Sequence, residues 1–446
     1  MFATLVVHAL MVALTTATKI DRPYCNTQMN TGVIPPLPTN ATLLQVHILH
    51  RHGSRTKDAA SPTEIWLGES KVIYNCTTQL LEGPDASVSP SGAVLFNKVY
   101  LSGRNELNGN CMTGQLVSKG LEMCQASGRH LAQAYKDFLP NNYEDFYLRS
   151  DDVPRTLASG QALFAAMYPD GGDVVPWHTM DINSDAETMV PNPKVCPNLV
   201  GARSSALSRF QASKHYQFVS TPLARELSNA INRTILPLEI ADLLDPLMSV
   251  QCSTVPSSGG TVPKTFTSNL QDRMIEEAAY KLYFGCNDTD VAKFGAGPLL
   301  GEILVKMERA LGQNEKENEN DNEKAVKMAI WSGHDTGPMS PVIGALGVGG
   351  SEFPRFNDLL AIELYSSTST SSASSAGAMV RVVHNGEVVT DLVPGCSDSV
   401  DSVHDGLCSW VHFHQTVMNM VPTPSECGRV DSPDWWPVPT AQQQQQ

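Results

Sequence analysis

Leu43-Leu-Gln-Val-His-Ile-Leu49 is a short apolar run between turn-forming stretches, and it predicts a buried β-strand. This strand ends at Arg51-His52-Gly53-Ser54-Arg55. A second apolar run, residues 325–331, predicts another buried strand, which ends at Ser332-Gly333-His334-Asp335. Two strands therefore bring polar clusters to their carboxyl ends, and this is the edge at which open α/β sheets bind ligands.

Amphipathic helices are predicted between and after these strands. Apolar residues recur at helical spacing near 116–138, 157–168, 274–282 and 299–311. Residues 361–365 and 380–383 predict a hairpin. Because strands alternate with helices, the sequence predicts an α/β fold with a mainly parallel central sheet flanked by helices.

The chain divides into segments of different character. Residues 40–171 and 291–428 are predicted to form the α/β domain, and residues 429–446 a disordered tail. Residues 172–290 are predicted to be an inserted, smaller and mostly helical lobe, because up to about residue 265 they are rich in Pro, Ser and Asn with only short helical pieces.

Composition limits the class of partner. The chain has 446 residues, of which 41% are hydrophobic and 17% charged, as in ordinary globular proteins. Lys plus Arg is 31 and Asp plus Glu is 46, so the net charge is 31 − 46 = −15. This charge argues against nucleic acid or an anionic membrane as the main partner, but a locally positive pocket could still take an anionic substrate.

The N-terminus and the cysteines indicate an oxidising compartment. Residues 2–17 are apolar and uncharged, and this run is shorter than the roughly 20 residues of a membrane span, so residues 1–18 are predicted to be a cleaved signal peptide. A buried helix or an uncleaved anchor are the alternatives. We expect no transmembrane segment in the mature chain. Ten cysteines and the sequons Asn40, Asn75, Asn232 and Asn287 predict a disulfide-bonded glycoprotein that is secreted or lumenal, in endosomes or lysosomes.

The first polar cluster suits an anionic ligand. Arg51 and Arg55 carry guanidinium groups whose geometry matches phosphate, sulfate or carboxylate oxygens. The positive charge on either side of His52 favours its neutral, nucleophilic form. The alternative is a loop at the end of a strand whose arginines pair with surface carboxylates.

Two further clusters are less specific by themselves. His334-Asp335 ends a buried strand, although an adjacent His and Asp is often structural. Arg155 lies where Ser150-Asp-Asp-Val-Pro-Arg-Thr156 enters a helix, and a helix N-terminus offers free N–H groups to an anion. The alternative is that Ser150 or the two aspartates cap the helix and that Arg155 is exposed.

These motifs together resemble the histidine acid phosphatases. Leu49-His-Arg-His-Gly-Ser-Arg55 resembles their RHGxR signature, and Trp331-Ser-Gly-His-Asp-Thr336 resembles their late His-Asp motif. Gly114–Gly120 and Leu148–Thr156 are similar to their intermediate blocks. Pro394-Gly-Cys396, followed by Cys408, resembles their C-terminal cysteine region, so that the motifs run in order from about residue 42 to 428.

The resemblance implies a division of roles. His52 attacks phosphorus and becomes phosphohistidine, while Asp335 protonates the leaving group and then helps to activate water. Four side chains hold the phosphate oxygens: Arg51, Arg55, Arg155 and His334. The family needs no metal and no other cofactor.

Two positions depart from the family pattern. Thr56 stands where the family usually has Pro, so we expect a looser loop there. Asp151 stands where the family usually has Thr, and we expect it to point outward, since a carboxylate in the pocket would repel phosphate. The late motif carries Asp, as in the acid phosphatases.

The resemblance also suggests two disulfides, Cys196–Cys427 and Cys396–Cys408. We further expect Cys252 to pair with Cys286. The other cysteines stay unassigned, because sequence alone does not fix connectivity.

The expected function is hydrolysis of phosphate monoesters at acidic pH, with small phosphorylated substrates as partners. The alternatives are a phytase or a lipid-phosphate phosphatase of the same superfamily, and a catalytically silent binding glycoprotein on the same fold. A homodimer is left open.

Overall fold

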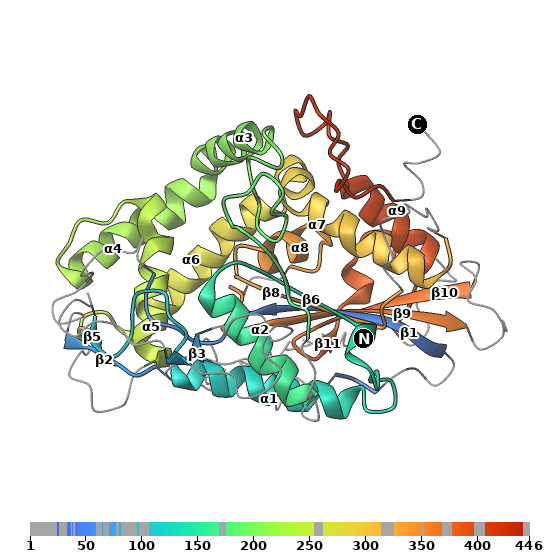
Figure 1. Ribbon diagram of the computed structural model, residues 1–446. Coiled ribbons are helices and arrows are strands. Elements are labelled where there is room, and N and C mark those ends of the chain that lie inside the picture. Colours follow the sequence, from blue (N-terminus) through green and yellow to red (C-terminus); the bar gives the residue numbers. More distant parts are fainter. Residues whose placement is uncertain are drawn as a thin grey trace, which may run out of the picture.

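The computed structural model shows how these segments pack (Figure 1). The structure describes residues 25, 34–36, 38, 41–58, 65, 71–76, 80–81, 96–97, 107–168, 175–253, 262–313, 325–349, 352–367, 377–396 and 406–439. The predicted signal peptide and the Asn40 sequon lie outside these residues, whereas Asn75, Asn232 and Asn287 are exposed. Within the described ranges, every helix is too short or too polar to cross a bilayer.

The central sheet confirms the predicted fold class. Its strand order is β11-β10-β9-β1-β8-β6-β7, with β12 paired to β10. The parallel centre consists of β1 (Ala41–Arg51), β8 (Met328–Gly333), β6 (Phe146–Asp151) and β7 (His178–Met180). The antiparallel side consists of β9 (Leu359–Ser367), β10 (Ala378–His384), β11 (Glu387–Val388) and β12 (Cys408–Ser409). The predicted hairpin is the pair β9 and β10.

Helices cover both faces of this sheet, as Figure 1 shows. On one face, α1 (Ser118–Ala134) and α2 (Pro154–Met167) pack through Leu131 and Leu163 onto Ile48 and Ile330. The other face is covered by α7 (Thr289–Ala310), α8 (Met339–Ala345) and α9 (Trp410–Met420), which bury Trp331 and Leu360. Because both faces are buried, β1 and β8 lack the strict alternation of apolar and polar residues that half-exposed strands show.

The segment between α2 and α7 is more helical than the sequence predicts. It contains α3 (Leu199–Ala212), α4 (Thr221–Ile231), α5 (Leu244–Ser253) and α6 (Ser268–Cys286), with a π turn at Tyr216–Ser220 and a 3₁₀ turn at Pro237–Leu243. The expectation of only short helical pieces is wrong, since α3 alone has 14 residues. Its periodicity is masked because Val200 and Leu207 are apolar but exposed. The boundaries 172–290 stay a prediction.

Short elements complete the described chain. Between β1 and α1 lie β2 (Ile73–Tyr74), β3 (Leu80–Leu81), β4 (Phe96–Asn97) and β5 (Asn108–Gly109). Two further 3₁₀ turns span Tyr143–Asp145 and Thr390–Leu392. The core of α4–α6 includes Tyr74 and Cys111 from this connection, so the helical part packs onto the segment that follows β1.

The disulfides correct one expected pair. The structure pairs Cys196 with Cys427 and Cys396 with Cys408, as the resemblance suggests, and it also pairs Cys76 with Cys111. The expected Cys252–Cys286 pair is wrong, because the N-terminal Cys25 reaches α5 and bonds to Cys252. Cys286 at the end of α6 and Cys124 in α1 carry free thiols.

The expected disordered tail is wrong for residues 429–439. Trp436 is buried against Val195 and the Cys196–Cys427 bridge. Its Nε1 donates to the carbonyl oxygen of Pro422 at 3.2 Å. An aromatic side chain next to an apolar disulfide thus holds this segment on the domain.

Candidate active site

The carboxyl ends of β1 and β8 bring the two polar clusters together. Arg51 pairs in register with Gly333, and the backbone N–H of His52 donates to the carbonyl oxygen of Gly333 at 2.9 Å. The imidazole rings of His52 and His334 meet edge to face, with centroids 5.4 Å apart. Parallel pairing of two strands distant in sequence therefore creates a single site.

His52 presents a neutral imidazole. Its Nδ1 lies 2.8 Å from the Gly53 carbonyl oxygen, which can only accept, so Nδ1 carries the proton. Its buried Nε2 has no hydrogen-bond partner among the described residues. Burial, followed by the positive charges of Arg51 and Arg155, lowers the pKa of His52 well below 6.5. The Nε2 lone pair is thus available for nucleophilic attack.

The loop that carries His52 is fixed by close backbone packing. A Cβ on Gly53 would lie 2.2 Å from the carbonyl oxygen of Gly120, near the start of α1. The backbone N–H of Gly53 also donates to Ser159 Oγ in α2, at 3.2 Å. Only glycine fits here, and α1 and α2 therefore set the position of the imidazole.

The arginines expected to bind phosphate each contact a carboxylate. Arg51 Nη2 lies 3.0 Å from Asp335, Arg55 Nη1 lies 2.7 Å from Asp245, and Arg155 Nη2 lies 3.4 Å from Asp58. Burial, and then the charge of Arg55, lowers the pKa of Arg155 to about 10, so it is still a cation at neutral pH. Three cations around one neutral imidazole could together bind a tetrahedral oxyanion.

Arg51 is held more rigidly than the other two arginines. It is buried, its Nη1 donates to the Pro354 carbonyl oxygen at 2.5 Å, and its guanidinium lies 4.5 Å from the centre of the Phe356 ring. Stacking on an aromatic face leaves the edge of the guanidinium free to direct hydrogen bonds. Arg51 therefore places Asp335 next to the ligand position.

Asp335 is an ionised carboxylate in the unliganded site. Burial alone would raise its pKa, but the charges of Arg51 and Arg55, with a smaller contribution from His334, hold the pKa below its ordinary value. A bound anion would offset those arginines and raise the pKa again. The same side chain could then donate a proton when a ligand is present.

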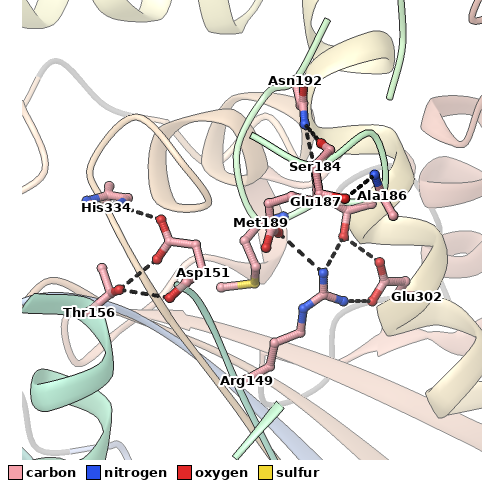
Figure 2. Close-up of polar contacts among 11 residues, drawn as sticks. Arg149, Asp151, Thr156, Ser184, Ala186, Glu187, Met189, Asn192, Glu302 and His334 are labelled. Atoms are coloured by element: carbon pink, nitrogen blue, oxygen red, sulfur yellow. Dashed lines mark hydrogen bonds and ion pairs between the residues drawn. The ribbon is translucent and has the colours of Figure 1, made fainter. Parts of the chain in front are cut away.

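Asp151 points into the site, which corrects the expectation that it points outward. It is buried, and its Oδ2 accepts a hydrogen bond from His334 Nε2 at 2.6 Å (Figure 2). Its Oδ1 accepts from Thr156 Oγ1 at 2.7 Å. The buried carboxylate is stabilised by these donors, so Asp151 orients His334 instead of facing solvent.

A buried network of ion pairs lies next to the site, and no motif in the sequence predicts it. Arg149, two residues before Asp151 on β6, contacts Glu187 and Glu302 (Figure 2). Thr188 also donates to Glu302. Glu187 Oε1 accepts from the Met189 backbone N–H at 2.5 Å. The network joins β6 to α7 and to the loop before α3, segments that are over 30 residues apart and carry no shared motif.

A cavity of about 600 Å³ opens in front of the arginines. One wall carries the predicted residues Arg51, Arg55 and Asp335. The helical part contributes further residues to the lining, with Asp242 before α5, Asp245 in α5 and Lys281 in α6. These wall residues, and Asp58 after β1, were missed because they belong to no recognisable motif.

Comparison with known proteins places this geometry in context. A model of the histidine phosphatase superfamily (branch 2) matches residues 42–385. Counting factor 60 of Dictyostelium discoideum is 26% identical over 356 residues, which cover 74% of this chain and 79% of that protein. Prostatic acid phosphatase of Rattus norvegicus is 26% identical over 309 residues, 64% of this chain and 74% of that protein. The phytase structure from Citrobacter braakii has a TM-score of 0.57 at 16% identity, and the match covers 87% of this chain and 100% of that chain, so it indicates a shared fold.

Proposed function

Because the chain belongs to branch 2 of the histidine phosphatase superfamily, we propose that it hydrolyses phosphate monoesters at acidic pH through a phosphohistidine intermediate. The observation that carries this proposal is the unpartnered, neutral Nε2 of His52, buried among Arg51, Arg55 and Arg155. A relative named as an acid phosphatase supports it. A silent binding protein would not need a buried nucleophile in its neutral form.

In the first step, the lone pair of His52 Nε2 forms a bond to phosphorus while the bond from phosphorus to the ester oxygen breaks. Asp335 gives its proton to the departing alkoxide, and Nδ1–H of His52 keeps its bond to Gly53. Negative charge on the transferring oxygens is stabilised by the three arginines and His334. The products are the free alcohol and phosphohistidine.

In the second step, Asp335 is ionised and accepts a proton from an attacking water molecule. The oxygen of that water forms a bond to phosphorus, the N–P bond breaks, and Nε2 regains its lone pair. Inorganic phosphate leaves with the proton balance restored. One carboxyl group thus serves as acid and then as base.

An acidic pH optimum follows from the two roles. Asp335 must be protonated with substrate bound, and a free Asp titrates near ~3.9. His52 must be neutral, and burial with nearby arginines lowers its pKa, so it stays neutral in acid. We therefore expect an optimum at roughly pH 4–6.

Substrates with a single phosphate group suit the cavity better than the highly phosphorylated substrates of phytases. Besides the arginines, Asp242, Asp245 and Asp58 line the cavity. Further phosphate groups on a substrate would approach these carboxylates, which would raise the free energy of binding. The phytase and lipid-phosphate alternatives are decided by a substrate panel.

The decisive experiment measures turnover of p-nitrophenyl phosphate at about pH 5 in the presence of a chelator. We expect turnover by the wild type and none by His52→Ala. Asp335→Ala should lose far more activity on glycerol 2-phosphate than on p-nitrophenyl phosphate, because p-nitrophenolate leaves without a proton.

Rapid-quench labelling with radiolabelled substrate tests the intermediate. The label on the wild type should be stable in alkali and labile in acid. A label that persists in His52→Ala would assign another nucleophile. Absence of turnover by the folded wild type would favour the binding-protein alternative, and turnover that requires added metal would contradict the mechanism.

The compartment is part of the same proposal. Four disulfides and exposed Asn75, Asn232 and Asn287 support a secreted or lumenal glycoprotein. Treatment with an endoglycosidase should then increase the electrophoretic mobility of the protein purified from a eukaryotic secretory host. Unchanged mobility would argue against glycosylation.

A further inference from the structure

The cavity of about 600 Å³ that Arg51, Arg55 and Asp335 line is called the reaction cavity below. A second cavity, which we call the side cavity, lies beside it, next to Asp335. It has a volume of about 230 Å³ and is lined by residues of α3, α6, α7 and α8. Both cavities include Lys281, Leu282 and Thr336 in their linings. None of these three side chains is buried, so solvent reaches the junction between the two cavities.

The side cavity is apolar. Its wall includes Ala206, Leu207, Phe210, Phe284 and Pro341, and its described lining contains no carboxylate. This differs from the reaction cavity, whose lining includes both carboxylates and arginines. An uncharged, apolar group would leave water on entering it.

The polar groups of the side cavity are directed elsewhere. Arg203 Nη2 donates to the Pro191 carbonyl oxygen at 3.3 Å, and Lys281 Nζ donates to the Leu238 carbonyl oxygen at 2.5 Å. Burial raises the pKa of the Cys286 thiol to about 12, so the thiol is neutral. These contacts leave the cavity without a group aimed at an anionic ligand.

The position of the side cavity relates it to the leaving group. In the reaction proposed above, the ester oxygen lies next to Asp335, which protonates it. The rest of the alcohol must extend away from phosphorus, and Thr336, the residue after Asp335, lines both cavities. The path away from Asp335 therefore includes the junction with the side cavity.

From this arrangement we infer that the side cavity is the subsite for the apolar part of the leaving alcohol. The preferred substrates are phosphate monoesters of alcohols that carry a short alkyl chain or a ring. An engineered cavity of about 150 Å³ binds benzene, so a cavity of this size accommodates a comparable or somewhat larger group. The inference rests on the proposed function, because Asp335 locates the leaving group.

The test uses n-alkyl phosphates from ethyl to hexyl, whose leaving alcohols have almost the same acidity. For the wild type we expect kcat/KM to rise by about two- to fourfold per methylene, the factor that corresponds to transfer of a methylene out of water. Equal kcat/KM across the series would overturn the subsite.

Substitution of Gly285 tests whether filling the side cavity removes the preference for longer alkyl chains. Gly285 lines the side cavity within α6, and a Cβ added there would meet no atom within 4 Å. Gly285→Leu places an alkyl group in the cavity, and the hexyl-to-ethyl ratio of kcat/KM should fall at least about fivefold, with Gly285→Ala intermediate. The control is Gly201→Leu in α3, where a Cβ also meets nothing within 4 Å and no described cavity is lined. Its ratio should equal that of the wild type.

Binding of ethyl- and hexylphosphonate provides a second measurement that needs no turnover. The wild type should bind hexylphosphonate more tightly, and Gly285→Leu should reduce the difference. A chain-length gradient that persists in folded Gly285→Leu would overturn the subsite. Failure of the proposed function would look different, because the wild type would then release no phosphate even from p-nitrophenyl phosphate.

Discussion

Asp151 holds His334 through a buried carboxylate–imidazole hydrogen bond of 2.6 Å. Asp151→Ala removes the acceptor and leaves the imidazole unrestrained, so we expect kcat/KM for p-nitrophenyl phosphate to fall by about 10–100-fold. Asp151→Asn keeps an acceptor for His334 Nε2 and should lose less than about tenfold.

Steady-state kinetics of the two variants checks this prediction. Recovery in the Asn variant distinguishes orientation of His334 from a general effect on folding, which thermal unfolding would reveal independently. Equal losses in both variants would mean that the charge of Asp151, and not its hydrogen bond, matters.

For individual residues, the sequence correctly predicted that the polar clusters after the two buried strands lie close together. His52, Arg51, Arg55, His334 and Asp335 meet because β1 and β8 pair in parallel. It did not predict the direction of Asp151, because a repulsion argument considers only the ligand and ignores two nearby hydrogen-bond donors, Thr156 and His334. Partners such as Asp245 come from segments whose position depends on tertiary packing.

Strand β1 and the residue that follows it carry three buried histidines that are neutral in the folded protein. Burial lowers the pKa of His47 to about 3, that of His50 to about 4 and that of His52 well below its ordinary value. In the unfolded chain each titrates near ~6.5. Below that pH the unfolded state binds more protons, so the free energy of unfolding decreases as pH falls, until each folded-state pKa is passed.

One carboxyl group opposes this trend. Burial raises the pKa of Glu187 to about 7, so between about 4.5 and 7 the folded state binds one extra proton. The three histidines bind three more protons in the unfolded state, and Glu187 binds one more in the folded state, so the unfolded state binds two more protons overall. The free energy of unfolding therefore decreases by about 3 kcal/mol per pH unit between about pH 6 and pH 5. The melting temperature should therefore fall from pH 7 to pH 5.

Scanning calorimetry across this range checks the prediction. His47→Gln should reduce the pH dependence of the free energy of unfolding by the equivalent of about one proton, whatever the substitution does to stability at pH 7. A melting temperature that rises on acidification would show that other groups dominate. The proposed acidic optimum then lies on the side where stability is decreasing.

Helix α1 contacts the loop that carries His52 through a second glycine, Gly120. A Cβ on Gly120 would lie 2.1 Å from the Ser54 carbonyl oxygen and 2.7 Å from its backbone nitrogen. Backbone atoms cannot move aside without displacing the loop, so Gly120→Ala should lower kcat/KM by at least about 100-fold.

Circular dichroism should show that this variant keeps its helices. The matched control is Gly201→Ala in α3, where no atom lies within 4 Å of the added Cβ and activity should be unchanged. Activity near the wild-type level in Gly120→Ala would mean that α1 does not set the position of His52.

Helices and strands were predicted best where their apolar residues occupy only buried positions. The two buried strands, the hairpin and the helices α6 and α7 follow from apolar runs and helical spacing. Helix α3 did not, because Val200 and Leu207 point to solvent or to a cavity and so obscure its periodicity.

At the scale of the whole molecule, charge should select among substrates. The chain carries a net charge of −15, and exposed Asp242 lines the reaction cavity together with Arg51 and Arg55. At low salt, kcat/KM for inositol hexakisphosphate should be at least about 100-fold below that for myo-inositol monophosphate, and the gap should narrow in high salt.

Two charge-matched variants test the location of this effect. Asp242→Lys should narrow the gap, whereas Glu144→Lys should not, since exposed Glu144 precedes β6 at the opposite edge of the sheet. Equal effects of the two variants would assign the selection to net charge alone. A wild-type protein that prefers inositol hexakisphosphate to the monophosphate would contradict the prediction that charge selects against highly phosphorylated substrates.

The Cys25–Cys252 bridge has a consequence for how the protein is made. Its cysteines are 227 residues apart, and those of Cys196–Cys427 are 231 apart. A ribosome adds about 5–20 residues per second, so Cys25 waits roughly ten to fifty seconds before its partner exists. During that interval Cys76, Cys111 and Cys124 emerge close behind it, and an early bond to any of them would be non-native. We therefore expect folding in an oxidising compartment to require a thiol isomerase, whereas the reducing bacterial cytoplasm should yield chains that lack these disulfides.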